Sequence, residues 1–137
     1  MGPSESLPAF QSSLERCLAD LTFTQRFYAR FVLSSDEVAA RFAHVDLKRQ
    51  ANVLRVSLYL VLRAAMGHQD GIEHLQEVAR THSKRGYDIP HHLYGHWLEC
   101  LIAAARETDP HFDAEHEAHW RNCLVPCVEL MTRQHGG

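Results

Sequence analysis

The chain has 137 residues, 45% of them hydrophobic, which predicts one domain over 1–137 with short disordered ends at 1–6 and 134–137. Its 14 Lys and Arg are balanced by 17 Asp and Glu, so no basic face is expected, and nucleic acid and membranes are excluded as partners. The N-terminus lacks the features of a signal peptide, and the longest apolar stretch, 53–66, is too short to span a bilayer, so we expect a cytoplasmic protein.

Helical periodicity without strand-like alternation predicts an all-α chain. The first helix is expected at 7–18, where Phe10 and Leu14 share one face. Thr22 followed by Gln25 has the pattern of a capping box, in which each side chain satisfies a free backbone N–H, and it predicts the start of a second helix.

The next two helices are also predicted from their N-terminal caps. Ser34 with Glu37 repeats the capping-box pattern and begins a short helix that ends near Phe42. Asp46 is expected to cap the most apolar helix, 47–66. Because the centre of that helix is apolar on nearly every side, we expect it to lie between two buried surfaces.

A further helix is expected at 72–84, with Gly86 ending it and Pro90 in the first turn of the next one, which continues to about residue 106. Asp113 is expected to cap the last helix, which runs to about residue 133 and is bent by Pro126. About seven helices of mixed length, two of them short, favour packing at steep crossing angles over a regular up-and-down bundle.

Histidine is unusually frequent, with 11 residues, and His82 falls on the apolar face of the helix 72–84. An imidazole that binds a metal needs its other ring N–H held by an acceptor. The backbone carbonyl of Val78 and the hydroxyl of Thr81 are within reach for that purpose. Position alone also fits a partly buried histidine without a ligand.

The segment 82–94 resembles the proximal segment of the globin family, in which the haem-ligating histidine precedes a turn, an aliphatic haem contact, a proline and an aromatic residue. By this resemblance His82 is the axial ligand of the haem iron, Ile89 the aliphatic contact and Tyr94 the aromatic residue. Trp97, one helical turn further, would line the same pocket.

Residues expected on the distal side of the haem also resemble those of bacterial globins. Phe27 and Tyr28 resemble a pair of bacterial globins in which the tyrosine points to the distal face, and the family's interval leads from there to Phe42, which packs against the porphyrin. The spacing in the globin domain of flavohaemoglobins, counted back from the proximal histidine, places Gln50 in contact with the distal ligand and Leu54 over the bound gas.

The resemblance covers about 22–130 and implies an all-α globin fold, a three-over-three helical sandwich around haem b, similar to single-domain bacterial globins and globin-coupled sensors. Flavohaemoglobins also pair a tyrosine like Tyr94 with a glutamate of the last helix, for which Glu129 is the candidate. The residues that the resemblance places against the haem are Phe42, Val53, Leu54, Val78, Ile89, Tyr94 and Trp97.

The expected function is binding of a diatomic gas (O2, NO or CO) at the iron, with high oxygen affinity because Tyr28 and Gln50 both donate hydrogen bonds to the ligand. Three alternatives remain open: an NO dioxygenase or peroxidase-like enzyme that uses a separate reductase, a gas sensor that acts through a partner protein, and a helical interaction module without cofactor. The protein is expected to be a monomer or a homodimer.

Other metal sites are disfavoured. His116 and His119 share a helical face near Glu115, but no third and fourth zinc ligands are evident, so a solvated face is expected. His91 and His92 are expected near the edge of the haem. The four cysteines are expected to be reduced thiols: Cys17, Cys100, Cys123 and Cys127.

Overall fold

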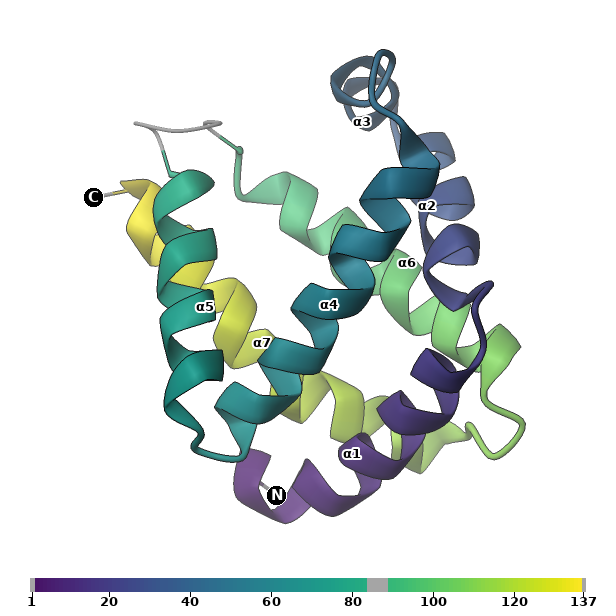
Figure 1. Ribbon diagram of the computed structural model, residues 1–137, viewed down its shortest axis with the longest axis vertical. Helices are drawn as coiled ribbons and strands as arrows, with labels where there is room; N and C mark the ends of the chain where they lie inside the picture. The colour runs from purple at the N-terminus through teal and green to yellow at the C-terminus, as the bar shows by residue number, and fades with distance from the viewer. Residues whose placement is uncertain (1, 84–88, 137) are drawn as a thin grey trace.

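The computed structural model describes residues 2–83 and 89–136. Within these ranges every regular element is a helix, as the periodicity predicts (Figure 1). The helices of the described chain are α1 (Pro3–Ala19), α2 (Phe23–Ser34), α3 (Asp36–Arg41), α4 (Leu47–Ala65), α5 (Gln69–Thr81), α6 (His92–Thr108) and α7 (Ala114–Gly136). In the part of the chain that is described, none of them combines the length and the apolar character that crossing a membrane requires.

Three helix pairs make the main contacts: α4 packs along α5, α1 along α7, and α2 along α6. In Figure 1, α4 crosses the front of the molecule diagonally, and α6 and α7 pass behind it. The α4–α5 pair joins neighbours in the sequence, whereas the other two pairs join segments that lie far apart in the chain. Long-range packing therefore closes the fold.

The core between α1 and α7 is built around Trp120, which is fully buried. Phe10 and Phe23 meet its ring edge-on, with centroids 5.1 and 6.4 Å away. The indole N–H donates to the Ser13 hydroxyl at 2.9 Å, so the polar atom of this large side chain is satisfied inside the core. This arrangement fixes the two terminal helices against each other.

A buried carboxylate joins the same region. The side chain of Asp109 is fully covered and accepts hydrogen bonds from Ser13 at 2.6 Å and from Arg16 at 2.7 and 3.0 Å. Burial alone raises the pKa of Asp109, but the hydrogen bonds from Arg16, Ser13 and the His111 N–H outweigh it and hold the pKa at about 2. The residue therefore stays charged and ties α1 to the turn between α6 and α7.

The N-terminal cap predicted for α4 is present, whereas the capping box predicted for α2 is not formed. Asp46 caps α4 as predicted, since its carboxylate accepts from the backbone N–H groups of Lys48 and Arg49 at 3.1 and 3.3 Å. The capping box at Thr22 was wrong, because the Thr22 hydroxyl donates to Asp20 at 2.7 Å and makes no cap hydrogen bond. The charged carboxylate of Asp20 is a stronger acceptor than a neutral group, so the Thr22 hydroxyl bonds to it and does not cap the backbone of α2.

The cap of α3 is shifted by one residue from the prediction. Ser35, not Ser34, is the N-cap, and its hydroxyl accepts from the Val38 N–H at 3.1 Å. Ser34 still belongs to the last turn of α2, where its hydroxyl donates to the Phe31 carbonyl at 2.6 Å. Only one extended residue, Ser35, separates α2 from α3, so this residue is the N-cap of α3.

Three other helix bounds differ from the sequence prediction. α1 begins at Pro3, inside the segment where a disordered end was expected, and Ser6 is fully buried. α5 begins at Gln69, three residues before the expected start, because the turn at Gly67 (φ +86°) is tight. α6 begins at His92, after a separate turn that contains Pro90, so Pro90 is not in the first turn of the helix.

α7 begins where the sequence predicts and extends three residues beyond its expected end at residue 133. Asp113 accepts from the His116 N–H at 2.9 Å, as predicted for a cap, and α7 continues to Gly136 with Pro126 inside it. The expected helix stop at Gly86 lies outside the described residues.

One expectation about α4 was wrong. Its buried residues form a single stripe: Ala51, Leu54, Leu58, Val61 and Leu62. On the opposite face Val53, Val56 and Tyr59 are each more than half exposed. The helix is apolar on nearly all sides, but α1, α2 and α5 cover only one of them, so α4 is not enclosed between two buried surfaces.

Candidate functional site

The predicted site residues come from elements that lie at the same end of the molecule. Figure 1 shows the C-terminal end of α5 on one side of this end, α3 and the beginning of α4 on the other, and the start of α6 between them. α5 ends at Thr81 and α6 begins at His92, so the segments expected on the proximal side of a haem adjoin this end. α2 and α4 supply the predicted distal residues.

His82 is the C-cap residue of α5 and is half-buried. Its ring Nδ1 is 2.7 Å from the Val78 carbonyl oxygen, which also accepts from the Thr81 hydroxyl at 3.1 Å. The expected contact to this carbonyl is therefore present. With the proton held on Nδ1, the lone pair of the imidazole is on Nε2, which is the form that binds a metal.

Tyr28 and Gln50, from α2 and α4, are hydrogen-bond partners through their side chains. Burial raises the pKa of Tyr28 to about 12, although the bond to Gln50 lowers it. The phenol is therefore neutral and keeps its proton at any ordinary pH. The two side chains present O–H and N–H donors side by side, and their contact with a ligand remains a prediction.

Aromatic rings surround Tyr28. Its ring lies 5.7 Å from the ring of Phe42 and 4.8 Å from that of Phe27, and Phe31 lies 5.8 Å from Phe42. Phe42 is the C-cap residue of α3 and packs on the main core while remaining partly accessible. Phe31 was not among the predicted site residues, and its spacing four residues after Phe27 in α2 is the signal that places it on this face.

Leu54 and Val53 are neighbours in α4 with opposite environments. Leu54 is buried in the main core and belongs to the buried stripe of α4. Val53 is 52% exposed, so the structure places it at the surface, and its contact with a haem remains a prediction. Trp97 of α6 packs against the main core, with its ring 6.2 Å from that of Phe27.

A second, smaller core cluster lies beside His82. Tyr94, Ala79 and Met131 form its buried centre, and Val78 and Ile89 pack against it. Three of the predicted proximal residues therefore belong to one apolar cluster. Burial raises the pKa of Tyr94 to about 12, so this phenol is also neutral.

The expected partnership of Tyr94 with Glu129 is not formed. Glu129 is exposed on α7, and the Tyr94 hydroxyl is buried without a hydrogen-bond partner. The prediction assigned the glutamate by its position in the last helix, but the register of α7 turns Glu129 to the solvent.

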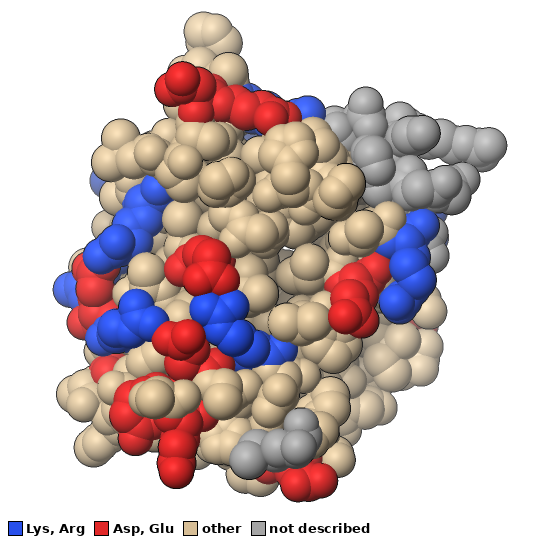
Figure 2. Space-filling view, turned by 180° about the vertical axis from the view of Figure 1, so that it is seen from behind, with Lys and Arg blue, Asp and Glu red and all other residues tan. Residues whose placement is uncertain are grey.

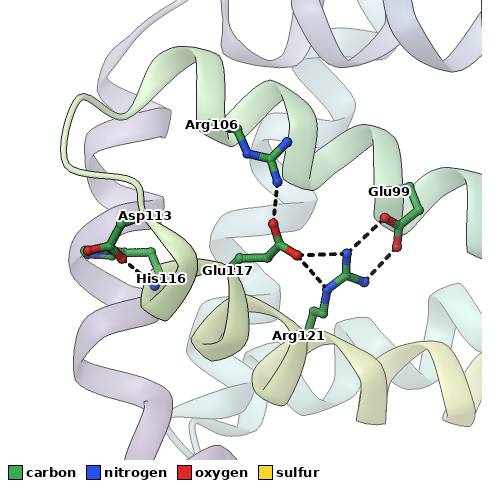
Figure 3. A network of polar contacts seen from close by, with 6 residues as sticks. All are labelled: Glu99, Arg106, Asp113, His116, Glu117 and Arg121. Carbon is green, nitrogen blue, oxygen red and sulfur yellow. Dashed lines mark hydrogen bonds and ion pairs between the residues drawn. The ribbon is translucent and has the colours of Figure 1, made fainter.

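The remaining histidines have other neighbours. Figure 3 shows His116 paired with Asp113 at 2.7 Å, next to a chain of ion pairs that joins α6 to α7. His119 contacts Ser6 at 2.9 Å, and within the described residues no group of three metal-binding side chains occurs. His92 reaches Glu37 of α3 at 2.7 Å. The four cysteines are free thiols, as predicted.

The fold and most of the chain match a solved structure. A crystal structure of a protein from Pseudomonas aeruginosa PAO1, described as structurally highly homologous to a human haemoglobin, superimposes with a TM-score of 0.89. The two chains are 30% identical, and the match covers 96% of this chain and 99% of the other. This chain belongs to the globin family.

The globin fold predicted from the sequence is thereby confirmed. No family model matches this globin, and no curated protein matches it. Its assignment to the family therefore depends on the structural match at 30% identity and near-complete coverage.

Proposed function

We propose that this globin binds haem b through His82 and that its function is to bind diatomic gases. The single observation that carries the proposal is the His82 ring, whose Nδ1 is held by the carbonyl of Val78 at 2.7 Å, beside the apolar cluster to which Val78, Ile89 and Tyr94 belong. A histidine fixed in this way has its tautomer and ring orientation set for an axial bond.

The lining residues fit a large apolar group. Tyr28, Leu54 and Tyr94 are buried, at 5%, 7% and 9% exposed. The other predicted contacts Val78, Ile89 and Trp97 are half-buried. They are mostly apolar with a few polar groups, the composition typical of cofactor sites.

When bound, the haem supplies an iron to which O2, NO or CO binds. The chain's own residues then set the strength of binding. The neutral Tyr28 hydroxyl and the Gln50 amide would donate hydrogen bonds to a bound gas, and Phe42 and Leu54 would keep water away from it. Two donors to a ligand that carries partial negative charge favour tight oxygen binding with slow release.

The direct test is a gas titration of the reconstituted protein. Purified apoprotein is mixed with haemin and reduced, and CO and O2 are added while the visible spectrum is recorded. We expect one gas molecule bound per chain, with an oxygen complex that outlasts its removal from solution. A protein that takes up haem but binds neither gas would contradict the proposed function.

A further inference from the structure

A surface groove of about 340 Å³ lies between α2 and α6. It is lined by residues of both helices: Arg30, Leu33, Ser34, Glu99, Cys100 and Ala103. Cys100 and Ser34 are hydrogen-bond partners through their side chains, so the two helices are linked where they line the groove. None of the six lining residues belongs to the set predicted for the haem site, and the groove is a separate feature of the surface.

Leu33 lines this groove with a side chain that is almost fully in solvent. At 86% exposed, it is the most exposed large hydrophobic residue of the described chain. A single exposed leucine is common on protein surfaces, but this one adjoins a groove on the same face. The face therefore has both an apolar projection and a hollow, which is what a surface needs to fit a second copy of itself about a twofold axis.

The charged residues of the groove are also complementary to each other. Arg30 and Glu99 carry opposite charges, and their side chains are 49% and 62% exposed. Each is held by a partner within the chain: Arg30 pairs with Glu107, and Glu99 pairs with Arg121 at 2.7 and 2.9 Å (Figure 3). Because they are already ordered, these side chains lose little further entropy when an opposite charge from another chain approaches.

The exposed apolar face of α4 lacks this self-complementarity. Val53, Val56 and Tyr59 are exposed there, but α4 carries four basic residues and no acidic one. Two copies that faced each other through α4 would bring like charges together, which opposes association. The balance of charge therefore favours the α2–α6 face for contact between copies of this chain.

We propose that the protein forms a twofold-symmetric dimer through the α2–α6 groove, with Leu33 of each copy seated in the groove of the other. The same arrangement sets Arg30 of each copy beside Glu99 of the other, and it covers Cys100, which lines the groove. This inference goes beyond the proposed gas binding and does not depend on haem.

Sedimentation velocity of the purified full-length protein, run from dilute to concentrated solution, tests the proposal. We expect the mass of the wild type to rise from that of one chain to that of two, and Leu33→Glu to weaken association by at least about tenfold. Leu21→Glu is the matched control, because Leu21 is 74% exposed but lies between α1 and α2, outside the groove lining. It should associate as the wild type does.

Charge reversal tests the contact between Arg30 and Glu99. Arg30→Glu and Glu99→Arg should each associate at least about tenfold more weakly than the wild type, because like charges then face each other across the interface. When the two variants are mixed in equal amounts, association should return, since each then meets the opposite charge on the other. Mixing leaves the internal pairs with Glu107 and Arg121 as they are, so a variant that is merely less stable would not be rescued.

A wild type that remains a single chain at every concentration would overturn the inference. So would association that Leu33→Glu leaves unchanged, or charge variants that stay apart when mixed. Cys100 gives an independent readout: its reaction with a soluble thiol reagent should slow as the wild type is concentrated, whereas the half-buried Cys127 of α7 should keep its rate. A dimer in which Cys100 reacts as fast as in the single chain would place the interface elsewhere and contradict the proposal.

Discussion

Tyr28 is the residue on which the expected gas affinity depends most. It is buried among the rings of Phe27, Phe31 and Phe42, and its only described polar contact is Gln50. A donor in such dry surroundings contributes more than it would in water. Its hydroxyl can therefore control how fast a bound gas leaves.

We expect Tyr28→Phe to release oxygen about tenfold to a hundredfold faster than the wild type, the effect of losing about 1.5–3 kcal/mol from one charge-biased hydrogen bond. Stopped-flow displacement of O2 by CO measures this rate. Tyr59→Phe on the exposed face of α4 is the control. Equal release rates for wild type and Tyr28→Phe would show that the phenol does not contact the ligand.

Asp109 gives a prediction about acid stability. Its pKa is about 2 in the folded protein, below the ordinary 3.8, so the stability it contributes is fully present above about pH 4 and is lost as the pH falls towards 2. Asp109→Asn should therefore be less stable than the wild type by about 2 kcal/mol at pH 7, with a difference that shrinks at pH 2.5.

Urea unfolding at the two pH values measures that difference. Asp36→Asn, at an exposed position in α3, is the control and should track the wild type. A gap between wild type and Asp109→Asn that is the same at pH 7 and pH 2.5 would mean that the carboxylate is not held charged by Arg16 and Ser13.

At the scale of the helices, the close packing of α4 on α5 determines where His82 lies. Gly71 makes this approach possible, because a Cβ at that position would lie 2.2 Å from the Ala64 nitrogen and 2.4 Å from the Leu60 carbonyl oxygen. Both are backbone atoms and cannot move aside as a side chain would. Any larger residue must push α5 away from α4.

Gly71→Ala should therefore be destabilising by about 1–3 kcal/mol, and haem should dissociate from it faster because α5 carries His82. The chain offers a matched control in Gly95, which lies in α6 with open space where its Cβ would be. Gly95→Ala should be neutral or stabilising by about 0.4–1 kcal/mol. Urea unfolding of both apoproteins checks the pair, and similar effects of the two substitutions would contradict the account.

The helices themselves were predictable from local sequence, whereas their relative placement was not. Asp46 and Asp113 marked helix starts correctly because a cap depends on the next three residues alone. Thr22 also marked a helix start, since α2 begins at Phe23, but its predicted cap hydrogen bond is absent because the carboxylate of Asp20, which is not part of the capping pattern, takes its hydroxyl. The exposed face of α4 shows the same limit, since periodicity counts apolar residues but does not say which neighbour covers them.

At the scale of the whole molecule, charge is distributed as the balanced composition predicts. On the face seen in Figure 2, acidic and basic side chains are interspersed. Several of them form ion pairs, including Arg121 with Glu99 at 2.7 Å and Arg106 with Glu117 (Figure 3). Most of these pairs are solvent-exposed, and each contributes little to stability.

The candidate site shows how far spacing alone can predict long-range contacts. Tyr28 and Gln50 are 22 positions apart in the numbering, and their side chains interact. Glu129 did not reach Tyr94, because the register of a helix that packs across the whole molecule depends on contacts at both of its ends. The resemblance named Tyr28 and Gln50 as a distal pair, which remains a prediction, and the structure was needed to show that Tyr94 makes no hydrogen bond to a described residue.

Whether His82 binds the haem iron is tested most directly by the visible spectrum of the haemin-reconstituted protein. The spectrum is recorded for the wild type, for His82→Ala and for the control His68→Ala, which removes an exposed histidine before α5. We predict a haem spectrum for the wild type and His68→Ala, with the ferrous form showing histidine ligation, and loss of that ligation in His82→Ala alone. Unchanged ligation in His82→Ala, or a wild type that remains colourless after reconstitution, would contradict the central claim.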